Sequence, residues 1–295
     1  MKPRWLKSQI PSGKNYHQLK GLLSELNLHT VCEEAKCPNI ADCWQRSTAT
    51  IMIMGDICTR SCGFCAVKTG KPLRLDEEEP QHVAEALSRL KLKHVVITSV
   101  DRDDLPDGGA RHFAKTIWMV KEKCPETKVE VLIPDFKGQK RALEMIFNAE
   151  PDVLNHNLET VASLQKQVRP QASYDTSLLV LSEAANAGLM AKSGLMLGLG
   201  ESNEEIQQAL QDLRERGQVS ILTLGQYLRP TPKHLEIKKY YHPEEFEHWK
   251  EYALNLGFQY VASAPMVRSS YHADSLTFFL NAQKESHKEK SIPSS

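Results

Sequence analysis

The sequence predicts an α/β fold: a partial (β/α)6 barrel of the TIM type, with one extension before it and one after it. Short apolar runs alternate with amphipathic helical patterns, which is typical of parallel strands joined by helices. The chain has 295 residues, and a barrel domain of roughly 250 residues with two extensions would use all of them. We count six strand–helix units, two fewer than a closed barrel contains, and therefore expect a lateral gap that could admit a bulky substrate.

The predicted strands are six apolar runs. The first, Ile51-Met-Ile-Met54, ends at Gly55, and an amphipathic helical pattern separates each run from the next. The six strands are expected at residues 51–54, 95–100, 129–133, 153–158, 194–199 and 221–228.

Helices are predicted from periodicity and from end signals. One covers residues 16–28, before the barrel, and another covers 81–92, where apolar residues recur at helical spacing. Ser202 and Glu205 form a capping box that begins a further helix. The last helix, 243–256, begins with a proline and stops at a glycine.

The barrel pattern divides the chain into four parts. Residues 1–48 are the N-terminal extension, residues 49–257 the barrel and residues 258–281 the C-terminal extension. Within the C-terminal extension, residues 259–270 are expected to be extended and to lie outside the strand–helix repeat. Residues 282–295 are polar and predicted to be disordered.

Composition excludes several classes of protein. Lys plus Arg and Asp plus Glu number 37 each, so the balance does not suggest a nucleic-acid or anionic-membrane partner. No apolar run approaches the roughly 18 residues of a membrane span, and the N-terminus has no apolar signal region. Six of the seven cysteines fall between Cys32 and Cys65, which suits metal ligation in a reducing compartment. We therefore expect a cytoplasmic protein.

The chain has two groups of three cysteines, which we call the first and second trio. The second trio, Cys58, Cys62 and Cys65, follows the first predicted strand in the run Cys58-Thr-Arg-Ser-Cys62-Gly-Phe-Cys65. The carboxyl end of a parallel strand is where such sheets place their chemistry. Three thiolates leave one position open on a centre that takes four ligands, so something else binds there. The alternative is half of a zinc site with distant partners. The spacing resembles that of radical S-adenosylmethionine (radical SAM) enzymes, whose open iron binds the cofactor.

The first cysteine trio precedes the barrel. Cys32, Cys37 and Cys43 have gaps of four and five residues, and two separate trios so close together rarely arise by chance. The one remaining cysteine, Cys124, cannot complete two four-cysteine sites. It is predicted to be a plain thiol at the end of a helix.

Both trios together resemble the lipoyl synthase family. Further matching runs are Lys2-Pro-x-Trp-Leu, Cys37-Pro-Asn-Ile40, Val100-Asp-Arg-Asp-Asp-Leu105 and Arg268-Ser-Ser-Tyr-His-Ala273. The resemblance extends from near residue 2 to about residue 274, over nine tenths of the chain. One departure is Ala41, where the family often has glycine.

The resemblance implies two 4Fe–4S clusters. Cys58, Cys62 and Cys65 would hold the cluster that binds S-adenosylmethionine. Cys32, Cys37, Cys43 and Ser270 would hold an auxiliary cluster, which is the sulfur donor. The implied reaction inserts two sulfur atoms at carbons 6 and 8 of a protein-bound octanoyl-lysine, so the three cysteines of the second trio and Ser270 are the predicted catalytic residues. A serine oxygen is a harder ligand than a thiolate, which suggests an iron that is easily released.

The resemblance also suggests contacts to S-adenosylmethionine. Asn157 and Glu159 end the fourth strand, where related enzymes contact the ribose, and Thr98 ends the second strand. Many related enzymes have Gly-Gly-Glu near Thr98, which this chain lacks. Gly198 and Glu201 belong to a run like the GxIxGxxE element that lies against adenine; a plain strand–helix turn is the alternative.

Less specific predictions concern four other side chains. The Phe64 ring could lie against the cluster or belong to the core. His156 should alternate away from the site and is predicted to be a packed histidine. Arg229 and Arg268 could meet a carboxylate or an acidic carrier, although we expect surface charges there.

The implied substrate is an octanoylated lipoyl carrier domain, either of a 2-oxoacid dehydrogenase E2 or the glycine cleavage H protein. A one-electron donor such as ferredoxin or flavodoxin and an iron–sulfur cluster carrier are further expected partners; nucleic acid and membrane are not. Two alternatives are a sulfur-inserting enzyme of the biotin synthase kind and a non-enzymatic zinc or iron–sulfur protein. Biotin synthase takes its second ligand set from inside the barrel, whereas here the first trio precedes the barrel. This difference favours the lipoyl synthase family.

Overall fold

The computed structural model describes residues 3–7, 13–35, 37–45 and 50–270. Lys2, the predicted disordered tail 282–295 and the end of the Arg268 motif, from Tyr271 onward, lie outside the described residues.

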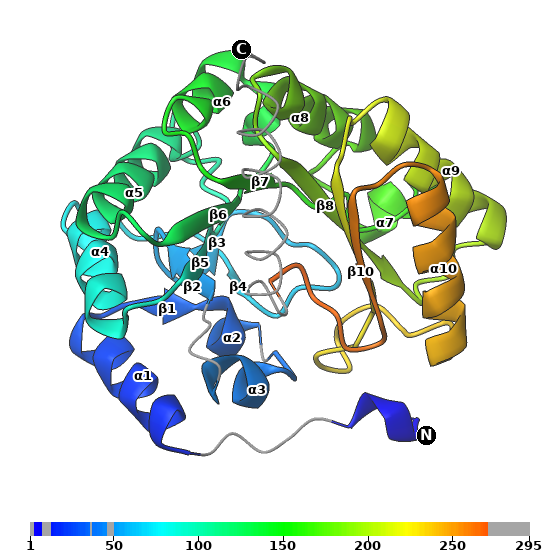
Figure 1. Ribbon diagram of the computed structural model, residues 1–295, viewed down its shortest axis with the longest axis horizontal. Helices are drawn as coiled ribbons and strands as arrows, with labels where there is room; N and C mark the ends of the chain where they lie inside the picture. The colour runs from blue at the N-terminus through cyan, green and yellow to red at the C-terminus, as the bar shows by residue number, and fades with distance from the viewer. Residues whose placement is uncertain (1–2, 8–12, 36, 46–49, 271–295) are drawn as a thin grey trace, which may run out of the picture.

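One eight-stranded sheet forms the centre of the molecule, in the order β1-β2-β5-β6-β7-β8-β9-β10. Every neighbouring pair from β2 to β10 is parallel, whereas β1 runs antiparallel to β2. The strands form an open arc, with two short helices of the N-terminal extension in the opening (Figure 1). The strands are β1 (His29–Thr30), β2 (Thr50–Ile53), β5 (His94–Ser99), β6 (Lys128–Leu132), β7 (Val153–Asn155), β8 (Ala191–Leu197), β9 (Ile221–Gln226) and β10 (Tyr260–Ser263).

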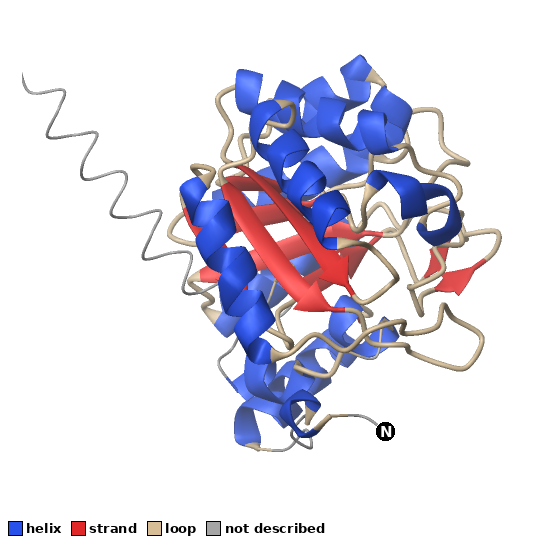
Figure 2. Cartoon of the chain, turned by 90° about the vertical axis from the view of Figure 1, so that its right-hand side faces the viewer, coloured by secondary structure: helices blue, strands red, loops and turns tan. Residues whose placement is uncertain are grey.

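A helix follows each of six strands of this sheet, so the six predicted strand–helix units are confirmed. These strands are β2, β5, β6, β7, β8 and β9. These helices lie outside the sheet (Figure 2). They are α4 (Glu79–Leu90), α5 (Ala110–Lys123), α6 (Lys140–Phe147), α8 (Tyr174–Asn186), α9 (Asn203–Glu215) and α10 (Pro243–Asn255). The predicted capping box of Ser202 and Glu205 begins α9, and Gly257 has a φ of +93° just beyond α10.

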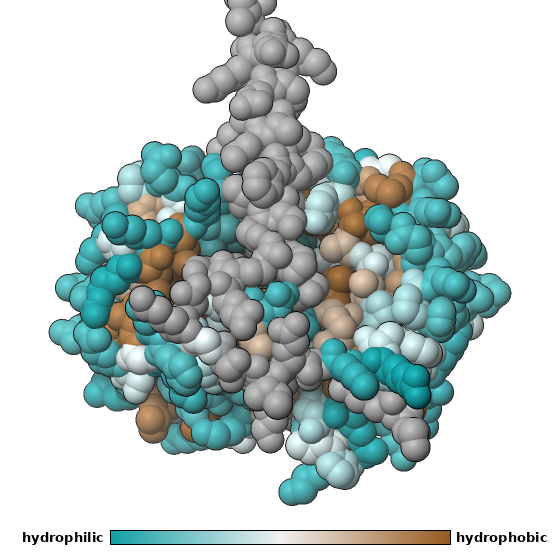
Figure 3. Space-filling model, turned by 60° about the horizontal axis from the view of Figure 1, so that its bottom comes forward, coloured by the Kyte–Doolittle hydropathy of each residue, from teal (hydrophilic) through white to brown (hydrophobic). Residues whose placement is uncertain are grey.

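Shorter elements complete the chain. The N-terminal extension holds η1 (Arg4–Leu6), α1 (Lys14–Glu25), α2 (Val31–Glu34) and α3 (Ile40–Gln45); η2 (Phe136–Gly138), η3 (Ala162–Leu164) and α7 (Gln165–Val168) lie in barrel loops. A two-stranded ribbon of β3 (Ile57–Cys58) and β4 (Lys68–Thr69) was not expected from the sequence. The face seen in Figure 3 is mostly hydrophilic, with hydrophobic residues gathered in smaller areas.

Two predicted segments differ in the structure. Residues 259–270 were expected outside the repeat, but Tyr260–Ser263 pair with β9 as a further parallel strand, because α10 is the crossover that leads into them. The fourth strand ends at Asn155 instead of residue 158. Beyond it, the chain stays beside β8, because Glu159 forms an isolated parallel bridge with Leu195; the φ of +70° at Glu159 marks where regular strand geometry is lost.

The hydrophobic core lies between the sheet and its outer helices. Leu87, Phe113 and Ile146 are buried under one half of the arc, and Leu210 and Phe246 under the other. Among the described residues, none of the helices is long and apolar enough to cross a membrane.

Candidate active site

One cavity of about 480 Å³ opens at the carboxyl ends of the strands, and both cysteine trios contribute to its walls. Cys43 is buried in α3 and is not among the lining residues. The predicted cluster ligands that line the cavity are Cys32, Cys37, Cys58, Cys62, Cys65 and Ser270.

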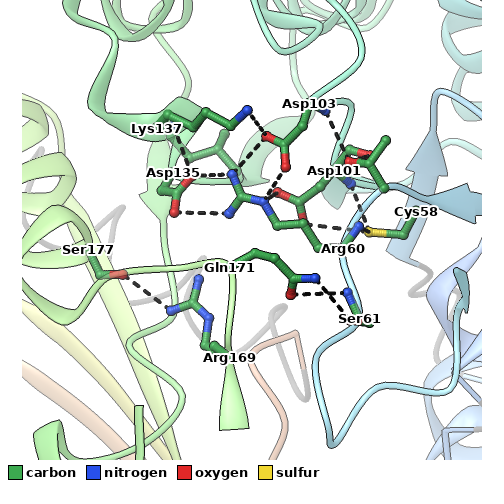
Figure 4. A network of polar contacts seen from close by, with 12 residues as sticks. Cys58, Arg60, Ser61, Asp101, Asp103, Asp135, Lys137, Arg169, Gln171 and Ser177 are labelled. Carbon is green, nitrogen blue, oxygen red and sulfur yellow. Dashed lines mark hydrogen bonds and ion pairs between the residues drawn. The ribbon is translucent and has the colours of Figure 1, made fainter. Parts of the chain in front are cut away.

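Arg60, inside the second trio, is the centre of a buried ion network (Figure 4). Its side chain is 4% exposed and donates two hydrogen bonds to Asp103, at 2.8 and 3.0 Å, and two to Asp135, at 2.7 and 3.0 Å. Asp101 lies 3.3 Å from the same guanidinium. Burial lowers the pKa of Arg60, but the carboxylates more than offset this, so the pKa is raised. Bidentate charge-assisted bonds are strong, and the network fixes the loop between Cys58 and Cys62.

The three cysteines of this loop are partly buried, and the Cys58 sulfur accepts hydrogen bonds. The Cys58 sulfur accepts the backbone N–H of Arg60 at 3.4 Å and of Asp101 at 3.3 Å. Burial raises the pKa of Cys58 to about 11 and that of Cys62 to about 12. These thiols therefore keep their protons at neutral pH until a metal displaces them. Hydrogen bonds to sulfur are one way in which proteins set cluster potentials.

Two further segments hold the same loop. Gly63 donates its N–H to the Val168 carbonyl at 2.9 Å and accepts the Leu235 N–H at 3.0 Å. A side chain at Gly63 would begin 2.9 Å from the Leu235 side chain, so this approach requires glycine. His234 Nε2 lies 2.9 Å from the Cys65 carbonyl oxygen. The loop is thus anchored on three sides by distant parts of the chain.

The first trio meets the C-terminal segment through Thr50. Burial raises the pKa of Cys32 to about 11, partly offset by the Thr50 backbone N–H, which donates to the sulfur. The Thr50 hydroxyl donates to Ser270 Oγ at 2.7 Å. Asn39, between Cys37 and Cys43, donates its side-chain N–H to the Met266 carbonyl at 2.7 Å. Ser270 therefore lies beside the first trio, although 220 residues separate it from Thr50.

Polar groups on β5 and after β7 line the cavity. The Asn157 side-chain NH2 donates to Glu159 at 3.1 Å and to Ser269 at 3.3 Å, while its side-chain oxygen, Oδ1, is buried without a partner in the described part of the chain. The Ser99 hydroxyl is likewise buried and unpartnered there. Thr98, also at the wall, donates to the Leu132 carbonyl at 2.8 Å. Unsatisfied buried oxygens are the groups that a bound polar cofactor would pair.

Gly198 and Glu201 lie away from the cavity wall. The Glu201 carboxylate accepts the N–H groups of residues 198–200, at 2.5 to 3.0 Å, and so shapes its own loop. From the same run, Gly194 and Met196 line the cavity instead. A Cβ at Gly194 would lie 2.5 Å from the Thr223 hydroxyl, which explains the glycine.

The sequence analysis missed Arg169. It is 8% exposed, lines the cavity and donates to the Asn157 carbonyl at 3.0 Å; its charge also opposes the rise that burial causes in the pKa of Glu159. Arg268, expected at the surface, instead lines the cavity, because the chain folds inward after Val267. Arg229 is exposed at the cavity edge, as expected for a surface charge.

Two predictions of ordinary packing are confirmed. His156 is 1% exposed, and its ring bonds to the Ile133 carbonyl at 2.8 Å and to Ser177 at 3.0 Å. Burial lowers its pKa to about 4, so it is neutral at physiological pH. Cys124 is a free, buried thiol at the end of α5.

The donor set fits iron–sulfur clusters in the following sense. Within the described ranges, no three His, Cys, Asp or Glu side chains converge on the position of a single metal ion. A 4Fe–4S cluster makes a different demand, because each iron takes its own thiolate at a separate corner of a cube. Five thiols of the two trios lie at separate positions on the cavity wall, and the Cys32 and Cys58 sulfurs accept backbone N–H groups, which suits such ligation; Cys43 is the exception, because it is buried outside the wall.

Comparisons with known proteins agree with this geometry. The sequence model of the Radical SAM superfamily matches residues 52–213, and that of the N-terminal domain of lipoyl synthase matches residues 1–37. The structure resembles Streptococcus suis SuiB bound to S-adenosylmethionine, with a TM-score of 0.56, 12% identity and coverage of 83% of this chain and 53% of that one. It resembles methylornithine synthase with a TM-score of 0.55 and 16% identity, over 91% and 92% of the two chains. Fold and site define a radical SAM enzyme, whose cofactors are a 4Fe–4S cluster and S-adenosylmethionine.

Curated relatives narrow the class. Lipoyl synthase of Rubrobacter xylanophilus is 54% identical over 278 residues, which cover 94% of this chain and 86% of the relative. Lipoyl synthase of Thermus thermophilus is 54% identical over 277 residues, covering 92% and 85%. The chain belongs to the lipoyl synthase family. It is a sulfurtransferase that inserts two sulfur atoms into an octanoyl chain on a carrier protein, and the alternatives of a biotin synthase or a non-enzymatic metal protein are set aside.

Proposed function

We propose that the two trios hold separate 4Fe–4S clusters in one cavity and that Ser270 is the fourth ligand of the cluster on Cys32, Cys37 and Cys43. The hydrogen bond between Thr50 and Ser270 carries the proposal, because Thr50 also donates its backbone N–H to Cys32. Cys43 does not line the cavity. It lies on α3, four residues after Asn39, whose side chain donates a hydrogen bond to the Met266 carbonyl.

The chain's own residues orient the reactants. When bound, the first-trio cluster would supply sulfide, and the second-trio cluster with S-adenosylmethionine would supply the one-electron carbon–sulfur cleavage that lets an unactivated carbon lose hydrogen. The network around Arg60 holds Cys58, Cys62 and Cys65 in one arrangement. Apolar side chains such as Met52 and Leu132 line the same cavity, suit an octanoyl chain and exclude water.

The residues that line the cavity suggest the contacts to S-adenosylmethionine. Asn157 and Ser99 each offer a side-chain oxygen that has no partner among the described residues, and Glu159 and Thr98 line the same cavity. Burial raises the pKa of Glu159, and the positive charges of Arg169 and Arg268 partly oppose that rise. Gly198 and Glu201 act indirectly, since they hold the loop that follows the Gly194 wall.

The proposed partners are those that the reaction requires. They are an octanoylated carrier domain, of a 2-oxoacid dehydrogenase E2 or the glycine cleavage H protein, a one-electron donor such as ferredoxin or flavodoxin, and an iron–sulfur cluster carrier that rebuilds the consumed cluster. Cluster thiolates need a reducing compartment, which is the basis for proposing a cytoplasmic location.

The test is an anaerobic assay of the purified, reconstituted protein with S-adenosylmethionine, a reductant and an octanoyl-lysyl peptide. We expect about eight irons per chain, deoxyadenosine, and a peptide that carries a dithiolane, all measurable by metal analysis and mass spectrometry. Deoxyadenosine without sulfur incorporation would contradict the sulfur-donor assignment.

Replacing Ser270 with Cys tests the proposed fourth ligand. Thiolate is a softer and more persistent iron ligand than a hydroxyl, so Ser270→Cys should keep the iron content and lose sulfur insertion. Ser182→Cys, on α8 and outside the cavity lining, is the matched control and should retain both the iron content and the activity. Full activity in Ser270→Cys would contradict this role.

A further inference from the structure

Trp44 carries a buried polar group that apolar packing does not explain. It follows Cys43 directly on α3, is 0% exposed, and its ring centroid lies 4.9 Å from that of Tyr16 on α1. Its indole Nε1–H is buried and donates no hydrogen bond to another described residue. A buried tryptophan N–H usually has a partner, because an unpaired donor costs free energy. A phenylalanine would fill the same core without that cost.

The Cys32 sulfur is the acceptor beside this N–H. Burial raises the pKa of the Cys32 thiol, and two N–H groups oppose the rise by favouring the thiolate: the Thr50 backbone N–H and the Trp44 indole N–H. Cys32 lies on α2, whereas Trp44 lies on α3. The indole therefore extends from the helix that carries Cys43 to the helix that carries Cys32.

Binding of iron would change the Cys32 sulfur from a weak acceptor to a strong one. A thiol accepts hydrogen bonds weakly, whereas a thiolate is charged and receives charge-assisted bonds. Cys32 must lose its proton to become a metal ligand. The indole N–H would then have the acceptor that it lacks among the described residues.

We infer that the indole N–H of Trp44 donates a hydrogen bond to the Cys32 thiolate of the first-trio cluster, which makes Trp44 a positioning residue for that cluster. The inference rests on the proposed function, which places a cluster on this trio. Hydrogen bonds to sulfur stabilise negative charge there, so the bond favours the reduced cluster and raises its potential. It also strengthens the attachment of Cys32 to iron.

The second trio offers a parallel for such donors. The Cys58 sulfur accepts the backbone N–H groups of Arg60 and Asp101, at 3.4 and 3.3 Å. At Cys32, one of the two donors is a side chain. A substitution can therefore remove this donor and leave the backbone unchanged.

The test uses the full-length chain with Cys58, Cys62 and Cys65 changed to Ala, so that the first-trio cluster is measured alone. We call this the parent chain. Trp44→Phe removes the N–H and keeps an aromatic ring. Trp249→Phe is the matched control, because Trp249 is buried on α10 and does not line the cavity. The measurements are the reduction potential, from a titration followed by electron paramagnetic resonance, and the rate at which a chelator removes iron.

We expect Trp44→Phe to favour the oxidised cluster by about tenfold, which lowers the potential of a one-electron couple by about 59 mV. The chelator should remove iron about threefold to tenfold faster, because Cys32 is held less firmly. Trp249→Phe should match the parent chain in both measurements. An unchanged potential in Trp44→Phe would overturn the inference, as would an equal shift in Trp249→Phe. Failure of the parent chain to bind a four-iron cluster would instead reject the proposed function.

A side chain of the same shape tests the N–H itself, and it decides the matter if Trp44→Phe fails to fold. Benzothienylalanine, introduced at position 44 alone, has a sulfur atom in place of the indole N–H and keeps both rings. We expect it to lower the potential as Trp44→Phe does, since it cannot donate to Cys32. A potential equal to that of the parent chain would overturn the inference, because the two side chains differ in that one group.

Discussion

The two cysteine trios share one cavity but are built differently. The loop of Cys58, Cys62 and Cys65 is held by a buried arginine, by three carboxylates and by backbone bonds to two other loops. In the first trio, Cys32 and Cys43 lie on the short helices α2 and α3 and Cys37 lies between them; within the described residues, Asn39 and Thr50 each donate a hydrogen bond to the segment that leads to Ser270. On our proposal the first arrangement suits a cluster that persists through turnover, and the second suits one that gives up its sulfide and is rebuilt.

Removing each trio in turn should have the largest effect on iron content and on product formation. A variant with Cys58, Cys62 and Cys65 changed to Ala should lose deoxyadenosine formation altogether, and its iron should fall from about eight to about four per chain. Changing Cys32, Cys37 and Cys43 to Ala should lower iron equally but leave deoxyadenosine formation in place without sulfur insertion. Metal analysis and mass spectrometry measure both. A first-trio variant that still makes dithiolane would refute the division of labour.

Arg60→Met should destabilise the loop that carries the second trio and leave the first trio unaffected. It leaves the buried Asp135 without its cation, whereas Asp103 keeps Lys137 at 3.4 Å, and the expected cost is about 3 kcal/mol in the free energy of unfolding. Urea unfolding of the metal-free protein measures the cost, and the spectrum of the reconstituted protein should show loss of the second-trio cluster first. Equal loss of both clusters would show that the network merely supports the fold.

Glu130→Gln is the matched control for a buried ion pair outside the cavity. Glu130 is fully buried and accepts from Lys192 Nζ at 2.7 Å. Its loss should also cost about 3 kcal/mol but should affect the two clusters equally. Burial raises the pKa of Glu130, but Lys192 and His94 more than offset this and leave it lowered. The pair's contribution is therefore present above the unfolded pKa of about 4.3 and is lost as pH falls through the folded value. Unfolding midpoints from pH 7 to pH 3 should converge for wild type and variant; parallel curves would contradict this.

Asn39→Ala should have a smaller and selective effect. It removes the bond to the Met266 carbonyl, worth about 1 kcal/mol, and should slow assembly of the first-trio cluster only. Gln208→Ala, which removes an exposed amide contact to Asp212, is the control and should change neither cluster. Slower assembly at the second trio would argue against separate sites.

The smallest expected effect is that of Thr50→Val. The change keeps the shape but removes the hydroxyl that donates to Ser270, at a cost below about 1 kcal/mol. Sulfur insertion should slow while deoxyadenosine formation is unchanged, and Thr50→Ser should restore it. If Thr50→Ser is as slow as Thr50→Val, the hydroxyl is not the relevant group.

Local patterns made much of the fold and both trios predictable. Strand and helix periodicity located the six units, and cysteine spacing located the trios, because both signals lie within a few residues of sequence. The contacts of Arg60 could not be read in that way: its partners lie 43 and 75 residues away, so only the fold brings them together. The same holds for Arg169 and for the inward turn at Arg268. Glu201 was read as a cofactor contact from its motif, and no pattern indicates that it bonds its own loop.

A single-turnover experiment with labelled sulfide tests the central claim most directly. The protein is reconstituted with a heavy sulfur isotope, freed of unbound sulfide and given one equivalent of octanoyl-lysyl peptide. If the first-trio cluster is the donor, both sulfur atoms of the dithiolane carry the label, and the variant lacking Cys32, Cys37 and Cys43 makes no product. Unlabelled sulfur in the dithiolane, or labelled product from that variant, would contradict the account.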